Sequence, residues 1–176
     1  GFDSNAIKIL KAKKNLRLID GTNYTSEELL KFVSFNQNIM LQSEDLNLFA
    51  KKNFKIVSKR KPTSKQLKDL IFAFNVCRYV KSNAIVLASN ETTVGIGSGQ
   101  PSRLDSCQIA INKMKKFNLQ NDNLVAASDA FFPFVDGIEK LVQSGVRAVI
   151  QPSGSIRDKD IINFANETDT VLLFSK

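Results

Sequence analysis

The sequence predicts an α/β fold in which a mainly parallel sheet is covered by helices on both faces. Two observations lead to this prediction. From residue 61 onward, segments with apolar residues at helical spacing alternate with short apolar runs of strand length. These runs are apolar throughout, which is typical of strands buried on both faces. Hydrophobic residues make up 43% of the 176-residue chain, enough to build such a core.

The first 60 residues are expected to form a scaffold segment of less regular structure. Their apolar spacing and capping residues predict a helix over 3–14 and strands over 16–19, 39–41 and 54–57. Thr25 or Ser26 is expected to begin a further short helix that carries Leu29, Leu30 and Phe32.

Residues 61–176 are expected to form one compact unit. Thr63 and Gln66 make a capping box that opens a helix with an apolar stripe ending near Cys77. Two strands separated by a short turn are predicted as a hairpin, over 84–88 and 92–96. The remaining predicted elements are a helix after the loop 97–102, a strand over 124–127, a helix over 135–143, a strand over 146–151, a helix over 158–167 and a strand over 171–174.

The composition excludes several kinds of site. The chain contains no histidine, so it cannot hold a Ser-His-Asp or Cys-His catalytic set or a His-ligated metal. Its two cysteines, Cys77 and Cys107, cannot make a Cys₄ site and are expected to be buried, reduced thiols of a cytoplasmic protein. No apolar run is long enough to cross a membrane. The net charge of +8 favours anionic partners, although the scattered lysines also fit a solvated surface.

Two glycine-containing loops each follow a strand and precede a helix. They are GSGQPS at 97–102 and PSGS at 152–155. Glycine lets a backbone approach a ligand closely, and a helix N-terminus favours an anion. Neither loop matches the dinucleotide or P-loop fingerprint. Both are candidates for binding a phosphate or carboxylate, and a plain connecting turn is the alternative in each case.

An aromatic loop and an amide complete the candidate site. The segment SDAFFPFVD at 128–136 places three phenylalanines between Asp129 and Asp136. Such a loop either plugs the core or lines a pocket for a flat ring, and an aspartate beside it either has a shifted pKa or only caps a helix. Asn83 can hold an amide-bearing ligand with two hydrogen bonds, or lie in a plain junction. Together these segments predict a site for a small anionic ligand beside a flat heterocycle.

Four motifs resemble one enzyme family, in the family's order. VKSNAIVLA at 80–88, TVGIGSGQPSRLDS at 93–106, SDAFFPFVDG at 128–137 and QPSGSIRD at 151–158 are similar to the transformylase part of the bifunctional AICAR transformylase/IMP cyclohydrolase family. That activity transfers a formyl group from 10-formyltetrahydrofolate to the 5-amino group of AICAR in purine biosynthesis. The resemblance implies a cytidine-deaminase-like, three-layer α-β-α fold without zinc. It also implies that 1–60 link to an absent preceding transformylase unit and that 61–176 are the second unit.

The resemblance also implies roles for particular residues. Asn83 would be catalytic beside the reacting amine, and Asp136 would be catalytic near the transferred formyl group. Substrate and folate would be bound by Arg103, Leu104, Pro133, Phe134, Ser153, Gly154 and Ser155. Ser82 and Asp129 match the surroundings of a monovalent-cation site, which implies K⁺ as a further cofactor.

One departure from the family limits what this chain is expected to do alone. The family's catalytic Lys-His pair lies in the preceding unit, and this chain has no histidine. The isolated chain is therefore expected to be inactive or nearly so, as part of a cytoplasmic homodimer that needs the rest of the transformylase domain and binds neither nucleic acid nor membrane. The alternative is a basic nucleic-acid-binding or dimerisation domain without catalysis, suggested by the charge of +8 and 13 phenylalanines.

Overall fold

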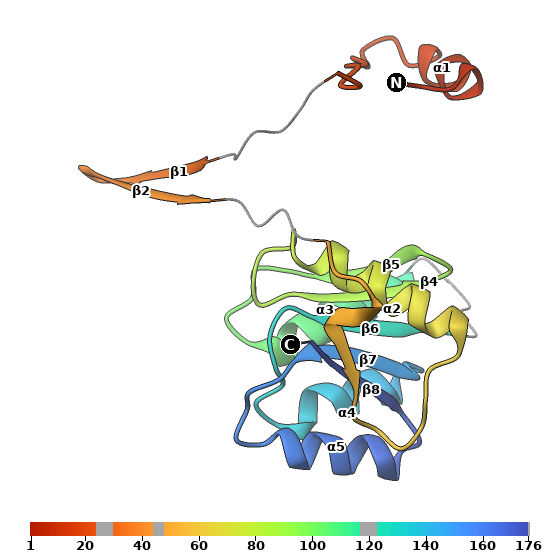
Figure 1. The fold of residues 1–176 in the computed structure, drawn as a ribbon, viewed down its shortest axis with the longest axis vertical. Coiled ribbons are helices and arrows are strands. Elements are labelled where there is room, and N and C mark those ends of the chain that lie inside the picture. Colours follow the sequence, from red (N-terminus) through yellow and green to blue (C-terminus); the bar gives the residue numbers. More distant parts are fainter. Residues whose placement is uncertain (24–29, 44–47, 117–122, 176) are drawn as a thin grey trace. The chain divides into compact units, whose positions relative to one another are not determined.

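A computed structural model describes residues 1–23, 30–43, 48–116 and 123–175 (Figure 1). The chain divides into two compact units, Gly1–Asn47 and Leu48–Lys176. Within the described ranges, no helix is both long and apolar enough to cross a membrane.

The first unit contains one helix and one hairpin. Helix α1, Ser4–Lys11, confirms the predicted N-terminal helix and begins where the Asp3 carboxylate accepts hydrogen bonds from two backbone amides. The strand predicted over 16–19 is wrong, because these residues pair with no other described strand. The strand predicted over 39–41 is confirmed as part of β2, Asn38–Ser43.

The predicted short helix is also wrong where it can be checked. Leu30 and Phe32 lie in strand β1, Leu30–Phe35, which pairs antiparallel with β2, whereas Thr25, Ser26 and Leu29 lie outside the described residues. Cross-strand pairing with β2, which places Phe32 opposite Leu41, favours the strand over the helix here.

The β1–β2 hairpin is apolar on both faces. Every residue of both strands is exposed. Because side chains alternate along a strand, one face carries Leu30, Phe32, Ile39 and Leu41, and the other carries Val33, Phe35 and Met40. An isolated two-stranded hairpin is only marginally stable in water. The pairing of β1 with β2 alone is therefore expected to give this hairpin little stability.

The second unit is built on a six-stranded sheet with the order β3-β8-β7-β6-β4-β5 (Figure 1). Strands β5, β6, β7 and β8 run in one direction, and β3 and β4 run in the other. This confirms the α/β class with a mainly parallel sheet, and the β4–β5 pair confirms the predicted hairpin. The strands are β3 Phe54–Ile56, β4 Ile85–Ser89, β5 Thr92–Gly97, β6 Val125–Ser128, β7 Ala148–Pro152 and β8 Val171–Ser175.

Helices cover both faces of this sheet, so the predicted three layers are confirmed. Val86 and Ala88 of β4 face a core shared with α2, whereas Ile85 and Leu87 face a second core shared with α3, α4 and α5. The capping box at Thr63 forms as predicted, with both hydrogen bonds present. The helices are α2 Ser64–Cys77, α3 Arg103–Lys116, α4 Val135–Gln143 and α5 Asp158–Glu167.

The second unit begins earlier than the sequence predicts. Its first residue is Leu48 rather than Lys61. Strand β3 adds to the sheet beside β8, and the Phe54 ring packs edge-on against Phe74 of α2 at 5.4 Å. Aromatic packing and strand pairing therefore make 48–60 part of the sheet unit rather than part of the scaffold segment.

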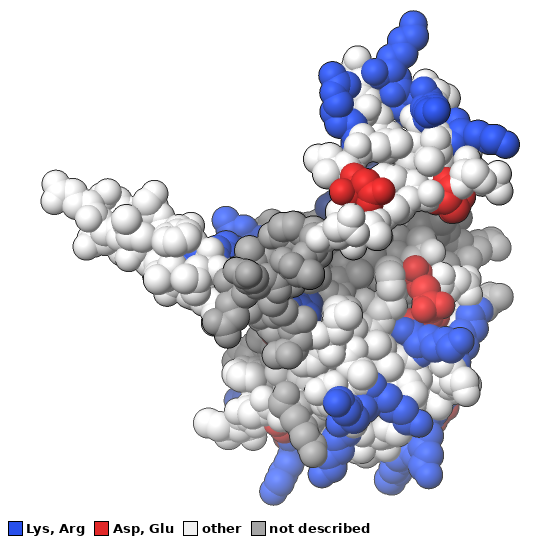
Figure 2. Space-filling model, turned by 45° about the horizontal axis from the view of Figure 1, so that its top comes forward, with Lys and Arg blue, Asp and Glu red and all other residues white. Residues whose placement is uncertain are grey.

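On the face of the second unit drawn in Figure 2, most of the Lys and Arg side chains gather at the bottom of the view, below largely white surface.

Candidate functional site

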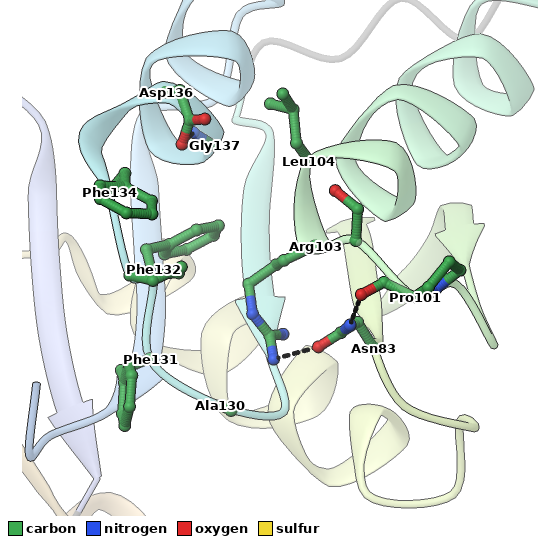
Figure 3. A pocket seen from close by; sticks show the side chains of 12 residues that line it. Asn83, Pro101, Arg103, Leu104, Ala130, Phe131, Phe132, Phe134, Asp136 and Gly137 are labelled. Carbon is green, nitrogen blue, oxygen red and sulfur yellow. Dashed lines mark hydrogen bonds between the residues drawn. The ribbon is translucent and has the colours of Figure 1, made fainter.

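Segments that are far apart in the sequence line one cleft in the second unit, with a volume of about 560 Å³ (Figure 3). Its walls come from Asn83, two residues before β4, from the end of the loop before α3 and the start of α3, from the loop after β6 and from the start of α4. Six residues singled out from the sequence line this cleft: Asn83, Arg103, Leu104, Pro133, Phe134 and Asp136. The cleft also contains Pro101, Ser102, Ala130, Phe131, Phe132 and Gly137.

Two glycines let helix α3 approach the sheet closely enough to build this cleft. A Cβ added at Gly97 would lie 1.9 Å from the Ser106 backbone oxygen, and one at Gly95 would lie 2.2 Å from that of Ala110. The expectation that the glycine of this loop serves ligand approach is therefore wrong for Gly97, because Gly97 serves strand–helix packing. Gly99 instead adopts a φ of +67°, which favours glycine in the turn before α3.

The aromatic loop is both a plug and a wall. Phe132 is 1% exposed and packs against Gly137, where an added Cβ would lie 2.7 Å from the phenylalanine ring. Phe131 and Phe134 are exposed at the cleft. The Arg157 guanidinium lies 5.0 Å above the Phe134 ring centre, so one face of this ring is already covered. The remaining surface offers apolar walls to a flat ligand.

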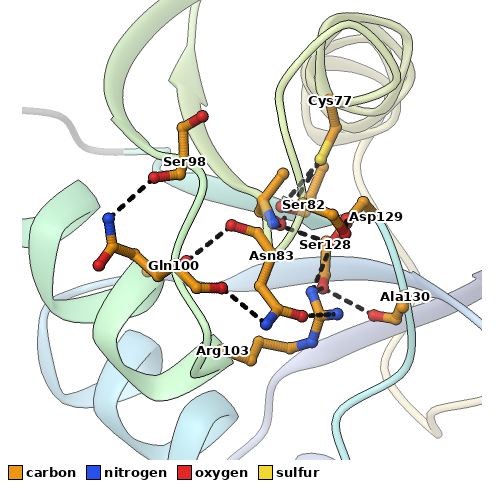
Figure 4. A network of polar contacts seen from close by, with 12 residues as sticks. Cys77, Ser82, Asn83, Ser98, Gln100, Arg103, Ser128, Asp129 and Ala130 are labelled. Atoms are coloured by element: carbon orange, nitrogen blue, oxygen red, sulfur yellow. Dashed lines mark hydrogen bonds and ion pairs between the residues drawn. The ribbon is translucent and has the colours of Figure 1, made fainter. Parts of the chain in front are cut away.

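A polar network lies at the inner end of the cleft (Figure 4). The Arg103 guanidinium forms an ion pair with Asp129, and the two side chains are only 9% and 16% exposed. Arg103 Nη1 also donates to Ser128 Oγ at 2.8 Å, and Nη2 donates to Asn83 Oδ1 at 2.7 Å. The sequence gives no specific reason to place Ser128 in this network. The one available signal is that Ser128 is a polar residue at the end of a buried strand.

The Asn83 amide has few hydrogen-bonding positions left. Its Nδ2 group donates to the backbone oxygens of Gln100, at 2.9 Å, and Pro101, at 3.1 Å. Both amide protons are therefore used, and Oδ1 keeps one acceptor position beside the bond from Arg103. The expectation that Asn83 holds an amide-bearing ligand with two hydrogen bonds does not fit this geometry, because no donor is left.

The two aspartates of the aromatic loop differ in their surroundings. Burial would raise the pKa of Asp129, but hydrogen bonds from Ser82, Arg103 and the Ala84 amide, together with the Arg103 charge, lower the pKa below its ordinary value. Asp129 is therefore a stable carboxylate. Asp136 is exposed at the cleft, where its Oδ1 accepts a hydrogen bond from the Gly137 amide at 2.7 Å.

Ser82 and Asp129, the predicted cation ligands, do lie together. The Ser82 hydroxyl donates to Asp129 Oδ2. In the described part of the chain, no three His, Cys, Asp or Glu residues are grouped as a metal site. A monovalent cation at this pair stays a prediction.

The loop Ser153–Ser155 lies outside the residues that line the cleft. Its Gly154 amide donates to Asp158 Oδ2 at 2.9 Å, and the Ser155 amide donates to the other oxygen of Asp158 at 3.3 Å. The carboxylate of α5 therefore occupies the position expected for a bound anion. Ligand contact by this loop stays a prediction.

Both cysteines are free and buried, as predicted. Burial raises the pKa of the Cys77 and Cys107 thiols to about 12. Neither thiol is a nucleophile at neutral pH, because the thiolate is the reactive form.

Comparison with known proteins assigns the chain to a family. The AICARFT/IMPCHase bienzyme family model matches residues 1–113, which include Asn83, Arg103 and Leu104. The chain belongs to this bienzyme family.

Individual members of the bienzyme family are similar along nearly the whole chain. The bifunctional purine biosynthesis protein PurH of Buchnera aphidicola subsp. Schizaphis graminum is 46% identical over 177 residues, and those of Persephonella marina and Aquifex aeolicus are 42% and 44% identical over 176 and 174 residues. Each match covers 99% of this chain and 34% of the relative. The chain thus spans about a third of the length of these relatives.

Proposed function

We propose that this chain is the second cytidine-deaminase-like unit of AICAR transformylase and supplies one side of its formyl-transfer site. The observation that carries this proposal is the convergence of three transformylase-like motifs on one cleft. Asn83 comes from the first motif, Arg103 from the second and Asp136 from the third, and all three line the same cavity.

The cleft suits the two proposed ligands. Phe131 and Phe134 offer exposed apolar surface to the flat ring of 10-formyltetrahydrofolate. Asn83 offers an acceptor, Oδ1, to an N–H of the 5-amino group of AICAR. Asp136 offers an exposed carboxylate on another wall, where a proton can be taken up.

The reaction itself needs alignment and proton movement. The amine nitrogen of AICAR attacks the formyl carbon, and the carbonyl oxygen becomes a tetrahedral oxyanion. The bond from that carbon to N10 of the folate then breaks. The amine loses one proton and N10 gains one. In this proposal Asn83 Oδ1 aligns the amine by accepting a hydrogen bond from an amine N–H, and Asp136 takes up or donates a proton close to the formyl group.

The proposal also includes partners that this chain does not supply. The catalytic Lys-His pair would come from the preceding transformylase unit, and the working form would be a homodimer. K⁺ would bind near Ser82 and Asp129. The Lys-His pair, the homodimer and the K⁺ site are proposed from the family resemblance alone. The contribution of Asn83 and Asp136 is also supported by the cleft that they line.

The bienzyme family unites two activities, and the experiment separates them. Titration calorimetry of the chain with AICAR, with a non-reactive folate analogue and with IMP measures which ligand the cleft accepts. We expect saturable binding of AICAR or the folate analogue, lost in N83A or D136A. N163A and E139A are matched controls, because Asn163 and Glu139 are exposed on α5 and α4 and lie outside the cleft.

Three results would contradict the transformylase assignment. Binding of IMP alone would favour the cyclohydrolase activity. Equal binding by N83A, D136A and the controls would remove the cleft from the site. A folded chain that binds neither AICAR nor the folate analogue would mean that the cleft is not a preformed half-site.

A further inference from the structure

The Arg103 side chain points into the protein network rather than being free for a ligand (Figures 3 and 4). Three of its N–H groups donate to protein atoms, on Asp129, Ser128 and Asn83. The side chain is 9% exposed. Three of the five N–H donors of this guanidinium are therefore used by the protein, and the fork made by its two terminal nitrogens is already engaged.

Asp129 anchors this arginine to the sheet. Its Oδ1 accepts from Arg103 and also from the Ala84 amide at 3.0 Å, and the Asp129 amide donates to the Ala84 oxygen at 3.3 Å. Asp129 follows β6, and Ala84 precedes β4. The arginine is therefore held by the ends of two paired, buried strands, which is a rigid support.

The network also fixes the orientation of the Asn83 amide. If this amide were flipped, Nδ2 would face the guanidinium and Oδ1 would face two backbone oxygens. The three hydrogen bonds of the Asn83 side-chain amide would then become contacts between like groups. The hydrogen bond from Arg103 keeps Asn83 Oδ1 on the side of the guanidinium. The Ser106 hydroxyl donates to the Asn83 backbone oxygen at 2.7 Å.

We propose that Arg103, held by Asp129 and Ser128, is a positioning residue that fixes the Asn83 amide so that it presents an acceptor to the cleft. Arg103 acts through Asn83 and does not itself contact ligand, in contrast to the ligand-binding role that the family resemblance implies. The ligand at this point is one that donates a hydrogen bond. That it is the AICAR amine rests on the proposed function.

Nuclear magnetic resonance of the 176-residue chain tests the positioning role without any ligand. In R103K a single Nζ replaces the planar guanidinium and cannot donate to Asp129 and Asn83 in the same geometry. We therefore expect the Asn83 side-chain amide signals to shift and broaden. The backbone signals of the sheet should stay unchanged. The matched control is R147K, because Arg147 is exposed and lies just before β7. Unchanged Asn83 signals in a folded R103K chain would overturn the proposal.

The wild-type chain provides a second measurement, which decides the question if R103K does not fold. A positioned pair predicts slowly exchanging Arg103 Nη protons with nuclear Overhauser contacts to the Asn83 amide protons. If these protons exchange freely and show no such contact, the proposal fails.

Calorimetry with AICAR then connects the positioning role to binding. We expect R103K to weaken AICAR binding by about 10-fold to 100-fold, the effect of losing a charge-assisted hydrogen bond, and R147K to leave binding unchanged. Equal affinity of R103K and wild type would show that orienting Asn83 does not serve the ligand. If the wild-type chain does not bind AICAR while the resonance test succeeds, the proposed function fails and the positioning role stands.

Discussion

At the scale of single residues, the Arg103–Asp129 ion pair is expected to contribute strongly to stability. Both side chains are almost buried, so removing one partner leaves the other charge without compensation. We expect D129A to lower the free energy of unfolding by about 3–5 kcal/mol. Urea denaturation measures this change. D160A is the control, because the Arg157–Asp160 pair is exposed and such pairs contribute about 0–1 kcal/mol.

Asp129 also gives the stability of the chain a pH dependence of known sign. Its pKa in the folded chain is below the ordinary value of 3.8. The stability it contributes is therefore fully present above 3.8 and is lost as the pH falls through the lower, folded-state pKa. Urea denaturation at a series of pH values below 5 should show this loss, with a smaller slope in D129N than in wild type. An identical slope in D129N would contradict the assignment.

The residues of the cleft and its polar network show what can and what cannot be predicted from the sequence. Asn83 and Asp136 were singled out from their motifs, and the cleft does bring them together. However, the sequence cannot give the direction of a side chain or its partners. The roles of Arg103 and of Ser128 depend on contacts across 20 or more residues, and the loss of donors at Asn83 depends on two backbone oxygens of another loop.

At the scale of elements, Gly97 sets the distance between β5 and α3. A methyl group at this position would overlap the Ser106 backbone, which cannot move without shifting the helix that carries Arg103. We expect G97A to lower the free energy of unfolding by about 1–3 kcal/mol and to disturb the Asn83 side-chain signals. Thermal denaturation and the same resonance spectra measure both effects. Wild-type stability in G97A would show that the helix has room to move.

The β1–β2 hairpin should behave differently from the sheet. Its strands are exposed throughout, whereas β6, β7 and β8 are almost wholly buried. We expect hairpin amides to exchange with solvent deuterium much faster than those of β6–β8, because opening the hairpin exposes little new apolar surface. Mass spectrometry of peptic fragments measures this. Slow exchange in the hairpin would show that another surface covers its apolar faces in solution.

These elements also explain which secondary structure could be predicted. In the second unit, strands buried on both faces and capped amphipathic helices leave a strong local pattern, so α2 and α4 were predicted from residues such as Thr63 and Gly145. In the first unit the pattern is ambiguous. The spacing of Leu30 and Phe32 is compatible with a short helix. Their pairing with β2, which is not visible in the local sequence, makes this segment a strand.

At the scale of the whole molecule, the chain holds part of the proposed chemistry and lacks another part. It supplies apolar walls, a positioned amide and a carboxylate, but no histidine. General acid–base catalysis contributes about 10²–10⁴ in rate. On the proposed function, the isolated chain should therefore transfer formyl groups to AICAR slower than a full-length relative by at least about that factor.

Supplying the missing part should restore the rate if this division of labour is right. Mixing the chain with a separately produced preceding unit of a PurH relative should raise formyl transfer, measured by the release of tetrahydrofolate. D136N in the chain should abolish that gain, whereas E139Q on the same helix should keep it, because Glu139 lies outside the cleft. Formyl transfer by the isolated chain at the rate of the full-length relative would instead mean that proton transfer needs no histidine from a preceding unit, and that Asp136 and its neighbours suffice.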